Sequence, residues 1–288
     1  MTVLSVCNHK GGTGKTTTSI HVAAALGLSG WRTLVIDLDP QGFLTRTMGG
    51  GEPEPGQSVA AFFDPDADLQ QIEVRELSGF DLIPSSNTLT RRMRDLNKPT
   101  DVLWVREALQ ALDLSYDLVL FDTAAAVTVY SLNALVASQH VLIPVLPEYQ
   151  SVVGGEQTYQ TTKLVENKLN PLLENQFFLF TQVDARKRMH KTYREYVREK
   201  YGSDVLDNII RTSTSLAKSQ DGETTIFDHD PNSRGAVDYA NATDELIGRI
   251  QASEVESGPS EATEHRPPPE PADAPSESAP ELRDILNS

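Results

Sequence analysis

The sequence predicts an α/β fold: a doubly wound, mostly parallel sheet with helices on both faces, followed by an acidic tail. Short apolar runs alternate with longer amphipathic segments over roughly the first 250 residues, as in strands joined by crossover helices. A glycine-rich loop separates the first run from the first amphipathic segment, and aspartates follow two later runs. Since the carboxyl ends of parallel strands meet at one edge, we expect the loop and these aspartates to form a single site.

The individual elements follow from hydrophobic periodicity. Strands are expected at residues 2–7, 33–37, 80–83, 117–121, 140–145, 177–181 and 207–210. Helices are expected at residues 15–29, 101–113, 130–138, 151–169, 188–201 and 235–250. Residues 49–68 are rich in Gly, Pro, Asp and Glu, which predicts an excursion over the surface.

The chain divides into one domain, residues 1–252, and a tail, residues 253–288. The tail is dominated by Pro, Glu, Ser and Ala, so it has little apolar surface to bury and is expected to be disordered. Its end regains amphipathic character, because Leu282, Ile285 and Leu286 share one helical face. That segment is either a weak partner-binding motif or a frayed end.

A loop between the first strand and the first helix has the composition of a phosphate-binding loop. Its residues are Lys10, Gly11, Gly12, Thr13, Gly14, Lys15, Thr16 and Thr17. Glycines let backbone N–H groups point inward at phosphate oxygens, and the following helix contributes the positive end of its dipole. A glycine turn without a ligand is the plainer alternative, but the strand–loop–helix setting favours a nucleotide. His9 replaces the first glycine of the usual pattern, and Lys10 adds a second lysine.

Four segments together resemble the ParA/MinD family of deviant Walker A P-loop ATPases, and especially its small, Soj-like ParA partition ATPases. The segments are the loop, residues 34–42 with switch I, residues 116–123 with the Walker B aspartate, and residues 141–149. The resemblance extends over roughly residues 1–250. It implies a P-loop NTPase fold that binds ATP and Mg²⁺ and hydrolyses ATP to ADP and phosphate, weakly alone and faster with a partner.

The resemblance also implies catalytic and phosphate-binding roles. Lys15 and the loop amides hold the triphosphate, and Asp39 positions or deprotonates the attacking water. Lys10 reaches across a two-fold interface to the phosphates of a second copy, so that ATP joins a homodimer. A pair of carboxylates that merely caps a turn is the alternative for Asp37 and Asp39.

The metal and the base have their own implied ligands. Thr16, Asp37 and Asp122 belong to the Mg²⁺ site. Asp184 and Arg211 lie where the family contacts adenine. Ala124-Ala125-Ala126 replaces the proline pair that usually follows the Walker B segment, which leaves this switch loop freer.

Charge is distributed unevenly along the chain. The formal net charge is −16, yet residues 186–200 contain seven bases against two acids, a local net charge of +5. Lys187, Lys191, Arg194 and Arg198 share one helical face. With the resemblance, this predicts non-specific binding to DNA phosphates; a solvated helix surface is the alternative. The residues expected to contact DNA are Arg186, Lys187, Arg188, Lys191, Arg194 and Arg198.

Composition points to the cytoplasm. The single cysteine, Cys7, allows no internal disulfide and excludes the cluster-binding iron proteins related to this family. No signal peptide is evident, and no apolar run approaches the length of a membrane span, so no membrane contact is expected.

The resulting hypothesis is an ATP-driven switch that dimerises, binds DNA over the nucleoid and moves a plasmid, chromosome or other cargo. A ParB-like or cargo-adaptor protein would stimulate its hydrolysis. Three alternatives remain open: a MinD-like division-site regulator, a nucleotide-gated scaffold with little hydrolysis, and a metabolic P-loop enzyme that phosphorylates a small molecule.

Overall fold

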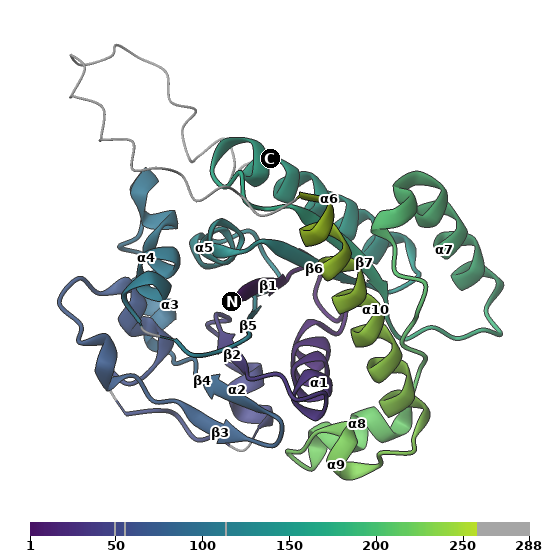
Figure 1. Cartoon of the computed structure of the whole chain (residues 1–288), viewed down its shortest axis with the longest axis horizontal. Helices are drawn as coiled ribbons and strands as arrows, with labels where there is room; N and C mark the ends of the chain where they lie inside the picture. Colours follow the sequence, from purple (N-terminus) through teal and green to yellow (C-terminus); the bar gives the residue numbers. More distant parts are fainter. Residues whose placement is uncertain (49, 55, 113, 258–288) are drawn as a thin grey trace.

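The computed structural model describes residues 1–48, 50–54, 56–112 and 114–257 (Figure 1). Within them, seven strands form one sheet in the order β3-β4-β2-β5-β1-β6-β7. Their bounds are β1 Thr2–Val6, β2 Thr33–Asp37, β3 Arg75–Leu77, β4 Phe80–Ile83, β5 Leu118–Asp122, β6 His140–Val145 and β7 Asn175–Phe180. All neighbours pair in parallel except β3 and β4, which form an antiparallel hairpin. The expected doubly wound, mostly parallel sheet is confirmed.

Helices flank both faces of this sheet. Their bounds are α1 Lys15–Leu28, α2 Phe43–Thr47, α3 Thr88–Arg92, α4 Trp104–Ala111, α5 Val129–Ala137, α6 Tyr149–Lys168, α7 Arg188–Tyr201, α8 Thr214–Asp221, α9 Ile226–His229 and α10 Arg234–Ser257. Successive residues of β5 face opposite cores: Leu120 packs with α1 and α10, and Phe121 packs with α4 and α5. A third apolar cluster joins β6 and β7 to α6 and α7.

The register of the central strands brings acidic residues together. Asp122 at the end of β5 lies opposite Val6 of β1 on one side and opposite Asp37 of β2 on the other. The loop that follows β1 therefore leaves the sheet beside two aspartates, as expected for parallel strands that end at one edge.

One predicted strand is wrong. Residues 207–210 form no strand; they run beside β7 between isolated bridges at Val205 and Arg211. The backbone N–H groups of Asp207 and Asn208 instead donate to the carboxylate of Glu245 on α10, at 2.6 and 2.7 Å. These side-chain hydrogen bonds divert the backbone from a regular ladder.

The expected surface excursion at residues 49–68 is also wrong in part. A 3₁₀ helix at Val59–Phe63 is buried, and Phe63 packs edge-on against Tyr130 with ring centroids 4.7 Å apart. The apolar residues of this stretch thus belong to the core under α4 and α5.

The predicted helix at 101–113 is in fact a 3₁₀ turn at Pro99–Val102 followed by α4, and residue 113 lies outside the described residues. Helix α10 continues to Ser257, and residues 258–288 of the expected tail also lie outside them. The domain boundary at residue 252 stays a prediction. None of the helices in the described ranges is long and apolar enough to cross a membrane.

Candidate functional site

The loop after β1 is bent by two glycines. Gly12 and Gly14 have φ angles of 77° and 84°, in the left-handed region that side chains disfavour. Gly14 immediately precedes α1, so the first amides of that helix open toward the loop. The backbone therefore has the shape and the electrostatic polarity of an anion cradle.

Hydrogen bonds from the neighbouring strands hold this loop in place. Asn8 donates from Nδ2 to the carbonyl of Pro144 in β6 at 2.7 Å, and its Oδ1 accepts from the N–H of Lys10 at 2.8 Å. Beyond β7, the Thr181 hydroxyl donates to the carbonyl of Thr13 at 2.8 Å, and Gln182 donates to that of Gly12 at 3.0 Å. The loop is thus fixed by groups from two strands before any ligand binds.

The two lysines of the loop differ in environment. Lys15 is buried, its Nζ donates to the carbonyl of Lys10 at 3.2 Å, and burial lowers its pKa against the opposing attraction of Asp122 and Asp39. The side chain of Lys10 is exposed. Helix α6 lies directly against Lys10, because a Cβ placed on Gly154 would come within 2.9 Å of the Lys10 Cβ.

Side-chain oxygen atoms that could bind a metal ion lie together at the end of the loop. The Thr16 hydroxyl donates to Oδ2 of Asp122 and the Ser19 hydroxyl donates to its Oδ1, both at 2.8 Å. Burial, only partly offset by these hydrogen bonds and by Lys15, raises the pKa of Asp122 to about 6. A threonine hydroxyl beside a carboxylate supplies the hard oxygen ligands that Mg²⁺ takes together with phosphate oxygens, so these residues fit that ion.

Asp37 also organises the segment that follows β2. Its Oδ2 accepts from the N–H and the hydroxyl of Thr45, at 3.0 and 2.7 Å, and its Oδ1 accepts from the N–H of Asp39 at 3.1 Å. Burial and then the nearby Asp122 raise the pKa of Asp37 to about 7. The alternative of a turn-capping carboxylate thus matches the contacts of Asp37, and its place in the metal shell stays a prediction.

Asp39 lies on the same edge but nearer to solvent. It is half-buried, its Oδ1 accepts from the N–H of Gln41 at 2.9 Å, and its carbonyl accepts from the Ser85 hydroxyl at 2.7 Å. The alanine segment after β5 adjoins the loop, since a Cβ placed on Gly11 would lie 3.9 Å from that of Ala125. The alanine segment therefore borders the phosphate loop, and the charge of Asp39 is close enough to act on Lys15.

A cavity of about 260 Å³ opens beside the loop between β7 and α8. Thr17 and Arg211 line it, and Arg211 is held by an ion pair with Asp238. Sequence reasoning missed Gln220, which donates to the Thr17 hydroxyl at 2.6 Å, and Tyr239, which closes the cavity from α10. The short polar sequence of α8 gave no periodicity that would have revealed Gln220.

Asp184, expected near the same ligand, does not line this cavity. It pairs with Arg186 and borders a groove of about 410 Å³ along α7. The two residues predicted to contact adenine are therefore separated by the structure, and only Arg211 reaches the cavity.

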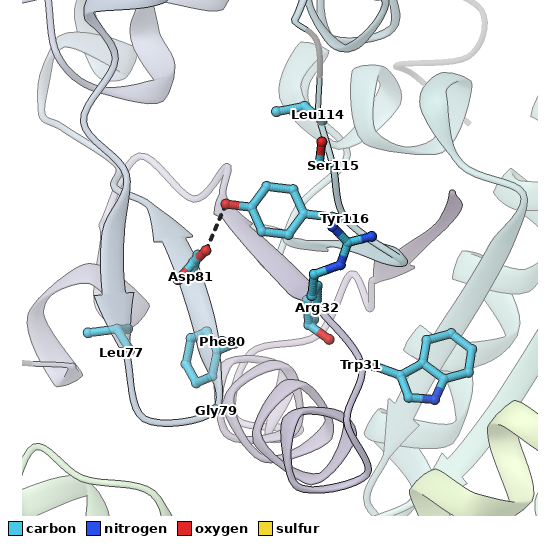
Figure 2. A pocket seen from close by; sticks show the side chains of 10 residues that line it. Trp31, Arg32, Leu77, Gly79, Phe80, Asp81, Leu114, Ser115 and Tyr116 are labelled. Carbon is cyan, nitrogen blue, oxygen red and sulfur yellow. Dashed lines mark hydrogen bonds between the residues drawn. The ribbon is translucent and has the colours of Figure 1, made fainter.

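A larger cavity, of about 630 Å³, lies at the opposite, amino-terminal edge of the sheet. Figure 2 shows Tyr116 pointing toward Asp81, to which its hydroxyl donates at 2.7 Å, with Arg32 beside Tyr116 and Trp31 farther from Asp81. None of the predicted site residues lines it. Cavity size alone would thus have misplaced the site.

The bases predicted to contact DNA gather on α7 and the turn before it, at the β7 end of the sheet (Figure 1). We call them the α7 basic surface: Arg186, Lys187, Arg188, Lys191, Arg194 and Arg198. Four of them form ion pairs: Arg186 with Asp184, Lys187 with Glu148, Lys191 with Glu195 and Arg198 with Asp207. Among the described residues, Arg188 and Arg194 have no carboxylate within ion-pair distance.

Comparisons with known proteins agree with this architecture. A family model described as an AAA domain matches residues 1–175. Sporulation initiation inhibitor protein Soj of Bacillus subtilis is 33% identical over 247 residues, which cover 85% of this chain and 97% of the relative. The chromosome-partitioning ATPase Soj of Thermus thermophilus is 34% identical over 248 residues, covering 86% and 96%.

Among solved structures, cobyrinic acid a,c-diamide synthase from Mycobacterium smegmatis, with bound ATP analogue and magnesium, is similar with a TM-score of 0.76. It is 29% identical, and the match covers 88% of this chain and 97% of that one. The phosphate loop, the paired aspartates and the extent of the sequence matches lead to one assignment. The chain belongs to the Soj/ParA family of chromosome-partitioning ATPases.

Proposed function

We propose that this protein is an ATP-dependent partition switch, in which ATP binding joins two copies and hydrolysis separates them. The observation that carries the proposal is the hydrogen bond from Thr16 to Asp122, which places a magnesium-type oxygen pair at the mouth of a phosphate loop. The named activity of the Soj relatives and the ATP analogue and magnesium bound to a structural neighbour support the same chemistry.

Each residue then has a chemical task at the triphosphate. Lys15 and the amides of residues 11–17 neutralise and orient the phosphate oxygens. Thr16 and Asp122 hold Mg²⁺, which when bound neutralises charge that develops on the phosphates. Asp39, the more exposed carboxylate, orients the attacking water.

Lys10 supplies the link between nucleotide and dimer. Its ammonium group is exposed beside its own loop, while Lys15 occupies the interior. A second copy facing this edge would place each Lys10 beside the phosphates of the other subunit. ATP thus becomes part of the interface, and its cleavage weakens it.

The base is proposed to enter the cavity beside α8. Its volume of about 260 Å³ and its mixed lining suit a planar heterocycle next to the phosphates. Thr17, Gln220 and Arg211 provide polar groups around it, and Tyr239 provides an aromatic wall.

The α7 basic surface is proposed to bind DNA without sequence preference. Six basic side chains on one helix and its preceding turn match phosphates rather than base edges. Non-specific DNA binding would hold the dimer over the nucleoid, and a ParB-like or cargo-adaptor protein would trigger release by stimulating hydrolysis.

Steady-state ATP turnover measured with and without duplex DNA, together with light scattering in ATP and in ADP, tests the proposal. We expect dimers only in ATP, DNA retention only of dimers, and slow turnover that rises with the partner protein. Monomers in saturating ATP and Mg²⁺ would refute it.

A nucleotide-gated scaffold is the second candidate, because Ala124-Ala125-Ala126 borders Gly11 without the stiffness of prolines. In that case ATP-dependent dimers and DNA retention would persist, but neither DNA nor partner would raise turnover. The same two measurements therefore separate the candidates.

A further inference from the structure

The chain carries two stretches of opposite charge that the proposed function does not connect. Residues 258–288 contain seven acids and two bases, a net charge of −5. Residues 186–200, which include the whole α7 basic surface, have a net charge of +5. Charges of opposite sign on one chain attract at low salt and are screened at high salt.

The ion pairs of the α7 basic surface do not fully neutralise its positive charge. Its four ion pairs use carboxylates that are between 20% and 69% exposed, and such surface pairs contribute little and exchange readily. Arg188 and Arg194 find no carboxylate partner among the described residues. Arg194 lines the groove along α7 together with Lys191 and Arg198. Burial and the neighbouring Arg198 lower the pKa of Arg194, as expected where positive charge is incompletely compensated.

The acidic segment follows α10, which passes near one end of this surface shortly before the helix ends. Arg249 of α10 contacts the carbonyl of Ser203, just past the end of α7, and also pairs with Asp207. Asp207 in turn pairs with Arg198 of the basic surface. Helix α10 continues only eight residues beyond Arg249, to Ser257, which is about 12 Å of helix.

The chain that follows is long enough to reach every base on α7. From the level of Ser203 to the start of α7 at Arg188 is roughly 21 Å of helix. A random-coil chain of 31 residues has a root-mean-square end-to-end length of about 30 Å. A tether of that length keeps its charges near the surface at an effective concentration on the order of millimolar.

We propose that the acidic residues 258–288 bind the α7 basic surface of their own subunit and compete there with DNA. Seven carboxylates on a polar, proline-rich chain present to the arginines what a stretch of phosphates would present. The competition rests on the proposed DNA binding, whereas the contact between tail and helix does not. The tail would then weaken DNA retention most at low salt, and so make the salt dependence of DNA binding less steep than it is without the tail charges.

The contact itself is tested without DNA in the full chain. Cys7 is the single cysteine and is buried, so Ser276→Cys introduces one accessible thiol for a nitroxide spin label. We expect selective broadening of backbone amide signals over residues 186–200, which disappears in about 0.5 M NaCl. Broadening that is uniform, or that centres on another face, would overturn the proposal.

A mixed sample separates binding within a chain from binding between chains. Isotope-labelled protein without the nitroxide is combined with unlabelled protein that carries it. Broadening of α7 signals in this mixture equal to that in the doubly labelled chain would assign the contact to a second copy and overturn the proposal. Its absence in the mixture supports a contact within one subunit.

The competition is tested by two variants of equal net charge. The tail variant changes five acids to their amides: Glu261, Glu264, Glu270, Asp273 and Glu277. The control changes five exposed acids on the β3–α4 side of the domain: Glu54, Asp66, Glu76, Asp95 and Glu107. DNA binding is read by fluorescence anisotropy of a labelled duplex, with ATP and Mg²⁺ present.

We expect the tail variant to bind duplex about tenfold more tightly than the unmodified chain at about 0.05 M salt, and the control to change by less than about twofold. The gap should close as salt rises. Equal affinities of the two variants would overturn the competition while leaving DNA binding intact. If neither binds DNA but α7 is broadened by the nitroxide, the proposed DNA function fails and the contact stands.

Discussion

Gly154 of α6 lies so close to Lys10 of the phosphate loop that a Cβ added to it would come within 2.9 Å of the Lys10 Cβ and 3.3 Å of Oδ1 of Asn8. Real Cβ atoms essentially never approach another carbon at that first distance, so the loop and the helix fit only because residue 154 has no side chain. The helix therefore sets the position of the lysine proposed to cross the dimer interface.

Substitution of this glycine should damage the site more than the fold. Gly154→Ala gains up to about 1 kcal/mol of helix propensity and loses roughly 1–3 kcal/mol to overpacking, so the net change in stability should be small. Displacement of Lys10 should nevertheless weaken ATP-dependent dimerisation by about tenfold, measured by light scattering.

The adjacent glycine is the control. A Cβ on Gly155 would meet Val145 of β6 at 2.7 Å, away from Lys10. Gly155→Ala should lower the melting temperature and leave dimerisation by the folded fraction unchanged. Equal dimerisation defects in the two variants would show that α6 as a whole, and not its contact with the loop, is responsible.

Removal of the buried lysine should abolish nucleotide binding. In Lys15→Ala the phosphates lose the charged group that lies inside the loop, and we expect at least about a hundredfold weaker binding, or roughly 2.8 kcal/mol. Titration with a fluorescent ATP analogue measures it, and circular dichroism checks folding. Binding within tenfold of the unmodified chain would contradict the role of Lys15.

Removal of the exposed lysine should spare nucleotide binding and abolish dimerisation. Lys10→Ala keeps the interior of the loop, where the ammonium of Lys15 remains, so nucleotide binding to the monomer should stay within about threefold. Dimers in ATP should be lost, because each subunit no longer offers a cation to the phosphates of the other. Normal dimerisation in light scattering would refute the cross-subunit role.

The contribution of Asp37 and Asp122 to the stability of the nucleotide-free protein should fall as pH rises from about 4 to about 7. Burial raises the pKa of Asp37 to about 7 and that of Asp122 to about 6, so the folded state holds protons that the unfolded state has released over this window. A raised carboxyl pKa therefore favours folding most at the acidic end, and the contribution declines to a plateau above about pH 7.

Denaturant unfolding of the unmodified chain and of Asp37→Asn between about pH 4.5 and 8 isolates this contribution. His9, His21 and His140, whose pKa values burial lowers to about 4, make stability rise with pH, but they do so in both proteins. Asp37→Asn should flatten the carboxyl contribution, since one of the two titrating groups is gone and the remaining carboxyl loses a negative neighbour. Added Mg²⁺ and nucleotide should flatten it as well, because a cation compensates the buried charge. The same pH dependence in both proteins would contradict the raised pKa of Asp37.

Neutralising part of the α7 basic surface should weaken DNA retention and spare the dimer. We take Arg186, Lys187, Arg188 and Lys191 to glutamine, and expect the salt slope of DNA binding to shrink by about 0.9 for each phosphate that the protein no longer neutralises. A control of equal charge change uses Arg91, Arg94, Lys98 and Arg106, on and near α3 and α4. Equal DNA retention by both variants would show that DNA binds to a different surface of the protein.

Much of the sheet was predictable because parallel strands buried on both faces read as apolar runs. β1, β2, β5 and β6 were found within one residue at either end from this signal alone. The hairpin strand β3 escaped, since its three residues, Arg75–Leu77, carry no such run. The false strand at 207–210 has apolar residues only at Ile209 and Ile210. The N–H groups of Asp207 and Asn208 instead donate to Glu245, which lies 38 and 37 residues away in sequence.

The site was predictable where it follows from chain topology and not where it depends on packing between distant helices. The loop and its aspartates lie at consecutive strand ends, so a parallel sheet necessarily gathers them. Gln220 reaches Thr17 across 203 residues of sequence, and Gly154 meets Lys10 only because α6 crosses that edge. Neither contact leaves a local pattern.

Helix α10 spans the molecule from the nucleotide edge, where Asp238 pairs with Arg211, to the opposite edge, where Ser253 accepts a hydrogen bond from Asn175. Its 24 residues make a rod of about 36 Å. A fluorescent reporter or an affinity tag attached after this helix would therefore lie far from the proposed nucleotide site. Such fusions should leave ATP turnover unchanged, even if the attached group covers the α7 basic surface that is proposed to bind DNA.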